Sequence, residues 1–87
     1  MTQQQQEFTF DDLRDILVNR IGLPAHEVVN DPSVSFESMG LDSLAFVEIQ
    51  LAVQQQYGFT IPDEDAHQIG TIGDAISYTN RRLQEQG

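Results

Sequence analysis

Apolar residues recur at helical spacing near the start of the chain. Between Phe10 and Ile21 they stand three or four residues apart, which places them on one face of a helix. Thr9 precedes this stretch and Asp12 follows three residues later, the pattern of a capping box. We therefore expect a first helix that ends near Gly22. Its apolar face consists of Phe10, Leu13, Ile16, Leu17 and Ile21.

The segment from Gly22 to Met39 has no sustained periodicity. It contains two prolines and three serines, which favour turns over a long helix or strand. We expect a long ordered loop with one helical turn near His26–Val29. Loops of this length in small domains are usually functional or held down by apolar side chains. Plain packing against the core is the role that we expect for Val34, Phe36 and Met39.

The longest helical pattern begins at Asp42 or Ser43, after Gly40, and ends at Gly58. It carries two apolar stripes. One has the spacing of a core face and consists of Phe46, Ile49, Val53 and Tyr57. The other lies on an adjoining face beside Glu48 and consists of Leu44, Val47 and Leu51. A domain this small has few neighbours with which to bury both, so we expect the second stripe to be a partly exposed contact surface. The alternative is a helix buried nearly all round.

Two shorter patterns follow Pro62. The acidic run Asp63–Asp65 carries the charge that a helix N-terminus favours, so we expect a short third helix to about Gln68. Thr71, with Asp74 three residues later, is expected to cap a last helix. The inner face of that helix consists of Ile72, Ala75, Ile76, Thr79 and Leu83.

The last helix has two weak positions. Gly73 lies in its first turn, and Thr79 occupies an expected apolar position, so this helix should contribute less stability than the second. The basic pair Arg81–Arg82 suits its C-terminal end.

The predicted elements define an all-α fold, a small four-helix bundle with three main helices, one short helix and a long first loop. The 87 residues suffice for one domain and not for two. We expect residues 1–8 to be a flexible N-terminal tail, residues 9–84 to be the folded domain, and residues 85–87 to be a flexible C-terminus.

Charge and composition exclude several classes of function. The chain has 14 acidic residues against 4 arginines and no lysine, so its net charge of −10 disfavours nucleic acid and anionic membranes as partners. A protein partner with a basic patch is the natural counterpart. The absence of cysteine excludes disulfides and protein thiolates, so any thiol chemistry must be imported. The sequence shows neither a signal peptide nor a membrane-spanning run, and we expect a cytoplasmic monomer.

One serine has a position suited to chemistry. Ser43 stands at the start of the long helix, where its hydroxyl should be exposed. The free backbone amides and the positive end of the helix dipole would favour a phosphate attached to it. The other interpretation is that Ser43 or Asp42 is merely the helix cap, and composition alone leaves both open.

The sequence Gly40-Leu41-Asp42-Ser43-Leu44 resembles the G-x-D-S-L motif of acyl carrier proteins. The resemblance extends from about Phe10 to Leu83 and includes the stretch Tyr57–Asp63. It implies that Ser43 carries a 4'-phosphopantetheine arm derived from coenzyme A, and that Asp42 helps the phosphopantetheinyl transferase engage it. It also implies an acyl carrier domain over residues 9–84 that is not itself an enzyme. The face read by partner enzymes would then comprise Leu44, Val47, Glu48 and, from the same stripe, Leu51.

Within that family, the chain is most similar to the freestanding carriers of aromatic, type II polyketide synthases. The resemblance implies partners of four kinds: the transferase, a ketosynthase with its chain-length factor, an acyltransferase and tailoring enzymes. Carriers of fatty-acid synthesis are the second choice, because their second helix is usually more acidic than this one, in which Glu48 is the only interior acid. Peptidyl carriers are the third choice, because they tend to have Gly-Gly-His-Ser at the attachment site.

Other classes of function fit less well. A serine hydrolase would need a base and a nucleophile elbow, but only His26 and His67 could serve as the base and the G-x-S-x-G pattern is absent around Ser43. The acidic run Asp63–Asp65 lacks the ligand spacing of a calcium loop, so we expect no metal site. An acidic helical interaction adaptor without a prosthetic group remains the rival from a different class.

Overall fold

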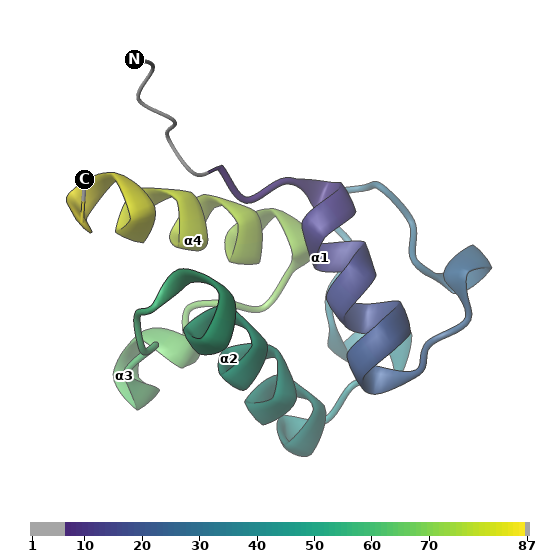
Figure 1. The fold of residues 1–87 in the computed structure, drawn as a ribbon. Coiled ribbons are helices and arrows are strands. Elements are labelled where there is room, and N and C mark those ends of the chain that lie inside the picture. The colour runs from purple at the N-terminus through teal and green to yellow at the C-terminus, as the bar shows by residue number, and fades with distance from the viewer. Residues whose placement is uncertain (1–6, 87) are drawn as a thin grey trace, which may run out of the picture.

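The computed structural model describes residues 7–86, which form α-helices and no β-strand. Four α-helices and three short helical turns lie within this range, so the predicted all-α bundle is confirmed. In Figure 1, α4 lies above α2, with α1 beside both and α3 at the far end of α2. The helices are α1 (Phe10–Ile16), α2 (Ser43–Tyr57), α3 (Asp63–Ala66) and α4 (Ile72–Gln86). None of the helices in residues 7–86 is long and apolar enough to cross a membrane.

The capping box predicted for α1 is present. The Thr9 hydroxyl accepts a hydrogen bond from the Asp12 amide, and the Thr9 amide donates to the Asp12 carboxylate. Beyond Ile16 the helix widens into the π-helical turn η1 (Leu17–Ile21). The chain turns at Gly22, and the amides of Gly22 and Leu23 both donate to the Leu17 carbonyl. The predicted end near Gly22 is therefore correct, whereas the change from α- to π-helical bonding was not predicted.

The first loop is ordered because its second half is bonded to the start of α4. The Phe36 amide donates to the Gly70 carbonyl and the Ile72 amide to the Val34 carbonyl, both at 3.0 Å. We call the segment from Pro32 to Phe36 the strap. One predicted turn is present as the 3₁₀ turn η2 (Ala25–Glu27), whereas a second, η3 (Glu37–Met39), was not predicted. The expected apolar anchors hold the loop: Phe36 is buried, and Val34 and Met39 are partly buried against the core.

Gly73 allows the strap to approach α4. A Cβ atom at this position would lie 2.8 Å from Cβ of Pro32 and 3.0 Å from its carbonyl oxygen, closer than nonbonded atoms normally approach. The Gly73 amide also donates to that carbonyl at 3.0 Å. The residue that weakens the helix on propensity alone thus permits the contact between loop and helix.

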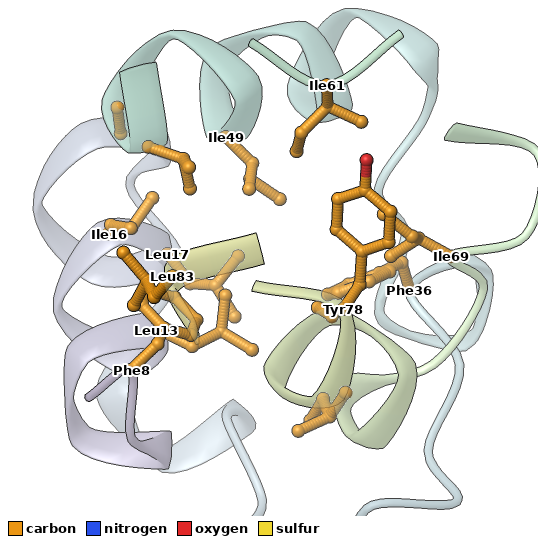
Figure 2. Close-up of a cluster of buried hydrophobic side chains, with 14 of the residues drawn as sticks. Phe8, Leu13, Ile16, Leu17, Phe36, Ile49, Ile61, Ile69, Tyr78 and Leu83 are labelled. Carbon is orange, nitrogen blue, oxygen red and sulfur yellow. The ribbon is translucent and has the colours of Figure 1, made fainter. Parts of the chain in front are cut away.

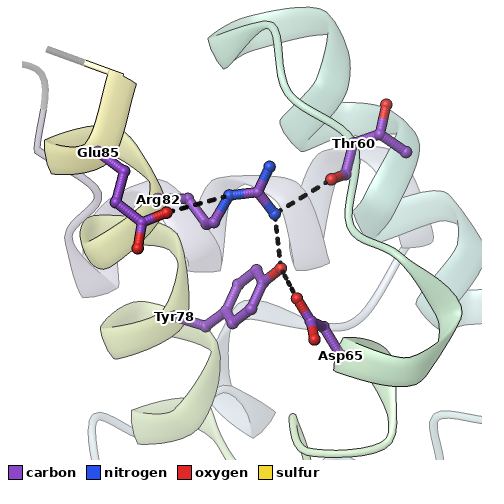
Figure 3. Close-up of polar contacts among 5 residues, drawn as sticks. All are labelled: Thr60, Asp65, Tyr78, Arg82 and Glu85. Carbon is purple, nitrogen blue, oxygen red and sulfur yellow. Dashed lines mark hydrogen bonds and ion pairs between the residues drawn. The ribbon is translucent and has the colours of Figure 1, made fainter.

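A polar network joins α3 and α4 (Figure 3). The Tyr78 hydroxyl donates to the Asp65 carboxylate at 2.6 Å and accepts from the Arg82 guanidinium at 2.7 Å. Arg82 also donates to the Thr60 carbonyl and stacks over the ring of Phe59 at 4.8 Å. These contacts fix the short helix α3, which ends at Ala66 and not near Gln68 as expected.

The core lies between α1, α2 and α4 and includes residues of the segments that join the helices, as Figure 2 shows. Phe8, which the sequence prediction placed in the flexible tail, is only 1% exposed and belongs to this core. Its backbone amide and carbonyl both bond to the side chain of Asn80, so the ordered domain begins before the predicted boundary. At the other end, α4 continues through Glu85 to Gln86, past the predicted end at residue 84. Residues 1–6 and Gly87 of the predicted tails lie outside the described residues.

Candidate functional site

Ser43 is the first residue of α2, one of the two starts that the sequence predicted. Gly40 ends η3 in the left-handed conformation, with φ of +80°, a value that side chains disfavour. The Leu41 amide then bonds back to the Phe36 carbonyl at 3.1 Å, which fixes the path of the chain into the helix. The side chain of Ser43 is consequently exposed at a fixed point on the surface.

Asp42, not Ser43, caps α2. The Asp42 carboxylate accepts a hydrogen bond from the Ala45 amide at 3.0 Å, and its carbonyl accepts from the Phe46 amide. Within the described part of the chain, the Ser43 hydroxyl makes no hydrogen bond. Of the two cap candidates that the sequence offered, the structure assigns the cap to Asp42, and the Ser43 hydroxyl stays available.

A cleft of about 500 Å³ opens beside Ser43. Its floor is apolar and joins the first loop, α2 and the turn before α4: Phe36, Ile49 and Ile69 are buried there, and Phe46 and Leu41 are half-buried. The ring of Phe46 lies 6.3 Å from that of Phe36, centroid to centroid. Exposed polar residues line the rim, among them Glu37, Asp42 and Ser43. A chain attached to Ser43 would therefore begin at the mouth of an apolar cleft large enough for a small ligand.

The two stripes of α2 face different surroundings, as predicted. Ile49 and Val53 are buried, and Phe46 and Tyr57 of the same stripe pack against the core. The second stripe is exposed: Leu44 by 79%, Val47 by 48% and Leu51 by 42%. We call Leu44, Val47 and Leu51 the apolar ridge. Its exposure rules out a helix buried all round.

Glu48, the predicted acidic member of the partner face, is paired within the molecule. Its carboxylate lies 3.4 Å from the guanidinium of Arg20 in η1, which also donates to the Gln55 side chain at 3.1 Å. Arg20 was not among the residues predicted for this surface. No local signal could have identified it, because the residues are 28 positions apart and meet only through the packing of η1 on α2.

An exposed hydroxyl at a helix N-terminus is suited to bear a phosphate ester. The amides of Ser43 and Leu44 have no acceptor within residues 7–86, so they remain available to an anionic group. The chain contains no cysteine with which to hold a thioester itself. The site could therefore carry a prosthetic group through a phosphodiester and place an apolar tail in the cleft.

Comparison with known proteins supports this interpretation of the site. Residues 11–79 match the family described as the phosphopantetheine attachment site. The chain is similar to the solution structure of 3-oxo-butyl-ACP, an intermediate mimic from the actinorhodin polyketide synthase in Streptomyces coelicolor. The identity is 31%, 97% of this chain and all of that chain are covered, and the TM-score is 0.80.

A second similar structure is butyryl-ACP from the same synthase, described as a non-polar, non-pathway intermediate. Here the identity is 31%, with 94% of this chain and 98% of that chain covered and a TM-score of 0.78. The family match spans most of the chain, and both structures align over nearly their full length. The chain therefore belongs to the acyl carrier protein family, whose prosthetic group is a covalently bound 4'-phosphopantetheine.

Proposed function

We propose that Ser43 is the attachment residue and that the chain carries polyketide intermediates between the enzymes of a type II synthase. The observation that carries the assignment is that Asp42 caps α2, which leaves the Ser43 hydroxyl exposed and without a hydrogen bond among the described residues. Ser43 combines an exposed hydroxyl, unpaired helix amides and an adjacent apolar cleft.

The residues around Ser43 fit the group on geometric and chemical grounds. The amides of Ser43 and Leu44 would face its phosphate, and the cleft floor formed by Phe36, Phe46 and Ile69 offers an apolar surface to what the arm carries. When bound, the group supplies a terminal thiol on which acyl units are held as thioesters. The chain itself then orients the cargo and limits its exposure to water, while the chemistry takes place on partner enzymes.

Asp42 has two roles under this proposal. Its carboxylate holds the first turn of α2 and remains exposed next to the attachment point. An exposed acid at that place offers a basic side chain of the phosphopantetheinyl transferase a contact beside the hydroxyl that reacts. The transferase uses coenzyme A, so we place the carrier in the cytoplasm, where that donor is made.

The polyketide assignment is supported by the similar structures and by the surface of α2. Both similar structures come from a polyketide synthase. Glu48 is the only acid in the interior of α2, and the remaining exposed positions include Gln54, Gln55 and Gln56. A fatty-acid carrier would be expected to present a more acidic helix, so the polyketide class is the better fit.

The proposal is tested by conversion from the apo to the holo form. The purified chain is incubated with coenzyme A, magnesium and a broad-specificity phosphopantetheinyl transferase, and its intact mass is recorded. We expect a gain of one phosphopantetheine for the wild type and for Ser38→Ala, a matched control five residues away, and no gain for Ser43→Ala. Circular dichroism verifies that each variant is folded. Modification of Ser43→Ala, or no modification of a folded wild type, would refute the proposal.

The pathway is tested with the holo protein. We expect faster acyl transfer to a type II polyketide ketosynthase than to a ketosynthase of fatty-acid synthesis. The reverse order would keep the carrier function and change the pathway.

A further inference from the structure

The ion pair between Arg20 and Glu48 lies on the face that the proposed function assigns to partner enzymes. Leu44, Glu48, Leu51 and Gln55 follow one another at i, i+4, i+7 and i+11, so they share one face of α2. The Arg20 guanidinium donates to Glu48 and to Gln55, two turns apart, and therefore runs alongside Leu51 of the apolar ridge. A partner that covers the ridge must also cover Arg20.

The Arg20–Glu48 pair is accessible enough for each residue to change partners. Its separation is 3.4 Å, longer than is usual for a charged hydrogen bond, and the side chains are 32% and 40% exposed. Exposed pairs of this kind contribute little to stability. The charges are thus accessible to a partner, and opening the pair would not threaten the fold.

Docking changes the electrostatics of these two residues. When a partner buries the ridge, water is removed from both charges, and an isolated charge in such a place is unfavourable unless it is paired. A partner with only a basic patch would satisfy Glu48 but place like charge against Arg20. The net charge of −10 would favour such a partner at long range, yet this face carries one cation and one anion.

We propose that a partner enzyme recognises Arg20, and that this face fits a docking site that carries both an acidic and a basic group. The partner is the acyl-accepting ketosynthase of the proposed function. Its docking site would be an apolar pocket for Leu44, Val47 and Leu51, bordered by one carboxylate for Arg20 and one basic group for Glu48. On docking the internal pair opens and each member pairs across the interface. This inference rests on the proposed function and adds the chemistry of the partner.

The experiment uses holo protein, acylated and verified by mass, with a type II polyketide ketosynthase that accepts the wild type. Four variants are compared by kcat/KM for acyl transfer: Arg20→Gln, Glu48→Gln, the exchange Arg20→Glu with Glu48→Arg, and Arg14→Gln. Arg14 is an exposed arginine on α1 and controls for total charge. Thermal unfolding establishes that the exchanged pair is folded.

We expect Arg20→Gln and Glu48→Gln each to lower kcat/KM about three- to tenfold, mainly through KM. The control Arg14→Gln should stay within about twofold of the wild type. The exchanged pair should unfold like the wild type but transfer no better than the single variants. Recovery of the wild-type rate by the exchanged pair would mean that the pair acts only as a contact within the carrier and that the partner does not recognise its charges. Faster transfer by Arg20→Gln would mean that Arg20 only masks Glu48. Either result overturns the inference, whereas failure of the wild type to become holo would instead refute the proposed function.

Discussion

Replacing Gly73 by alanine should destabilise the fold, although the same change in an open helix stabilises it. Alanine is favoured over glycine by about 1 kcal/mol within a helix. At Gly73, however, the added Cβ would lie 2.8, 3.0 and 3.3 Å from three atoms of Pro32. Carbon atoms in contact normally stand about 3.5–4.0 Å apart, so the strap would have to move by several tenths of an ångström or more.

The neighbour of Gly73 cannot easily give way. The closest atoms are Cβ of the Pro32 ring and the backbone of that residue, and the strap is bonded to the start of α4 through Val34 and Phe36. Overpacking of this kind costs about 1–3 kcal/mol. Subtracting the propensity gain of about 1 kcal/mol leaves a net loss of about 0–2 kcal/mol. Because the atoms that clash belong to a ring and to backbone, we expect the upper half of that range. Each kcal/mol lowers the Tm of a domain of this size by about 4–8 °C.

The assay is thermal and urea unfolding of Gly73→Ala beside a matched pair at Ser77, an exposed position in the same helix. The difference between Ser77→Ala and Ser77→Gly measures the gain in propensity without a clash. A Gly73→Ala protein as stable as the wild type, or more stable by the increment measured at Ser77, would show that the strap does not press against α4 as described.

Four further substitutions test the division between core, network and surface. Val47→Ala should change the free energy of unfolding by no more than about 0.5 kcal/mol yet slow acyl transfer, whereas Ile49→Ala should cost about 2–5 kcal/mol; unfolding of Val47→Ala would show that the apolar ridge is core. Burial and the bond to Asp65 raise the pKa of Tyr78 above its ordinary value. The stability that Tyr78 adds to the folded state through this shift is therefore complete below the unfolded pKa of about 10. It is lost as pH rises through the raised folded pKa. Tyr78→Phe should show a smaller alkaline loss of Tm than the wild type, and an equal loss would contradict this. Asn80→Ala should lower the free energy of unfolding by about 1–3 kcal/mol, because it leaves the backbone of Phe8 without its partners; urea unfolding with no change in midpoint would contradict this role.

The second helix was predictable from the sequence because its signals are local. Its start at Ser43 and end at Tyr57 follow from a cap and a terminating glycine, and the two stripes follow from helical spacing. The exposure of the apolar ridge was predicted from the small number of elements available to cover it. The motif at Ser43 was also visible, since it occupies adjacent residues.

The features that the sequence did not predict depend on contacts between distant residues. Phe8 is buried because Asn80, 72 positions away, binds its backbone. Gly73 has a role only because the strap passes it, and Arg20 joins the partner face only because η1 packs on α2. Likewise, Asp42 and Ser43 are both acceptable caps on propensity, and the hydrogen bond to Ala45 is what distinguishes them.

The central claim is that the Ser43 hydroxyl bears the prosthetic group, and residue-level mapping tests it most directly. Cleavage of the holo protein before aspartate and after glutamate releases residues 42–48, in which Ser43 is the only hydroxyl. The neighbouring Ser38 is released separately, on the segment that precedes Asp42. We expect the mass of phosphopantetheine on the 42–48 peptide alone. Its presence on the peptide with Ser38, or on any other, would contradict the account.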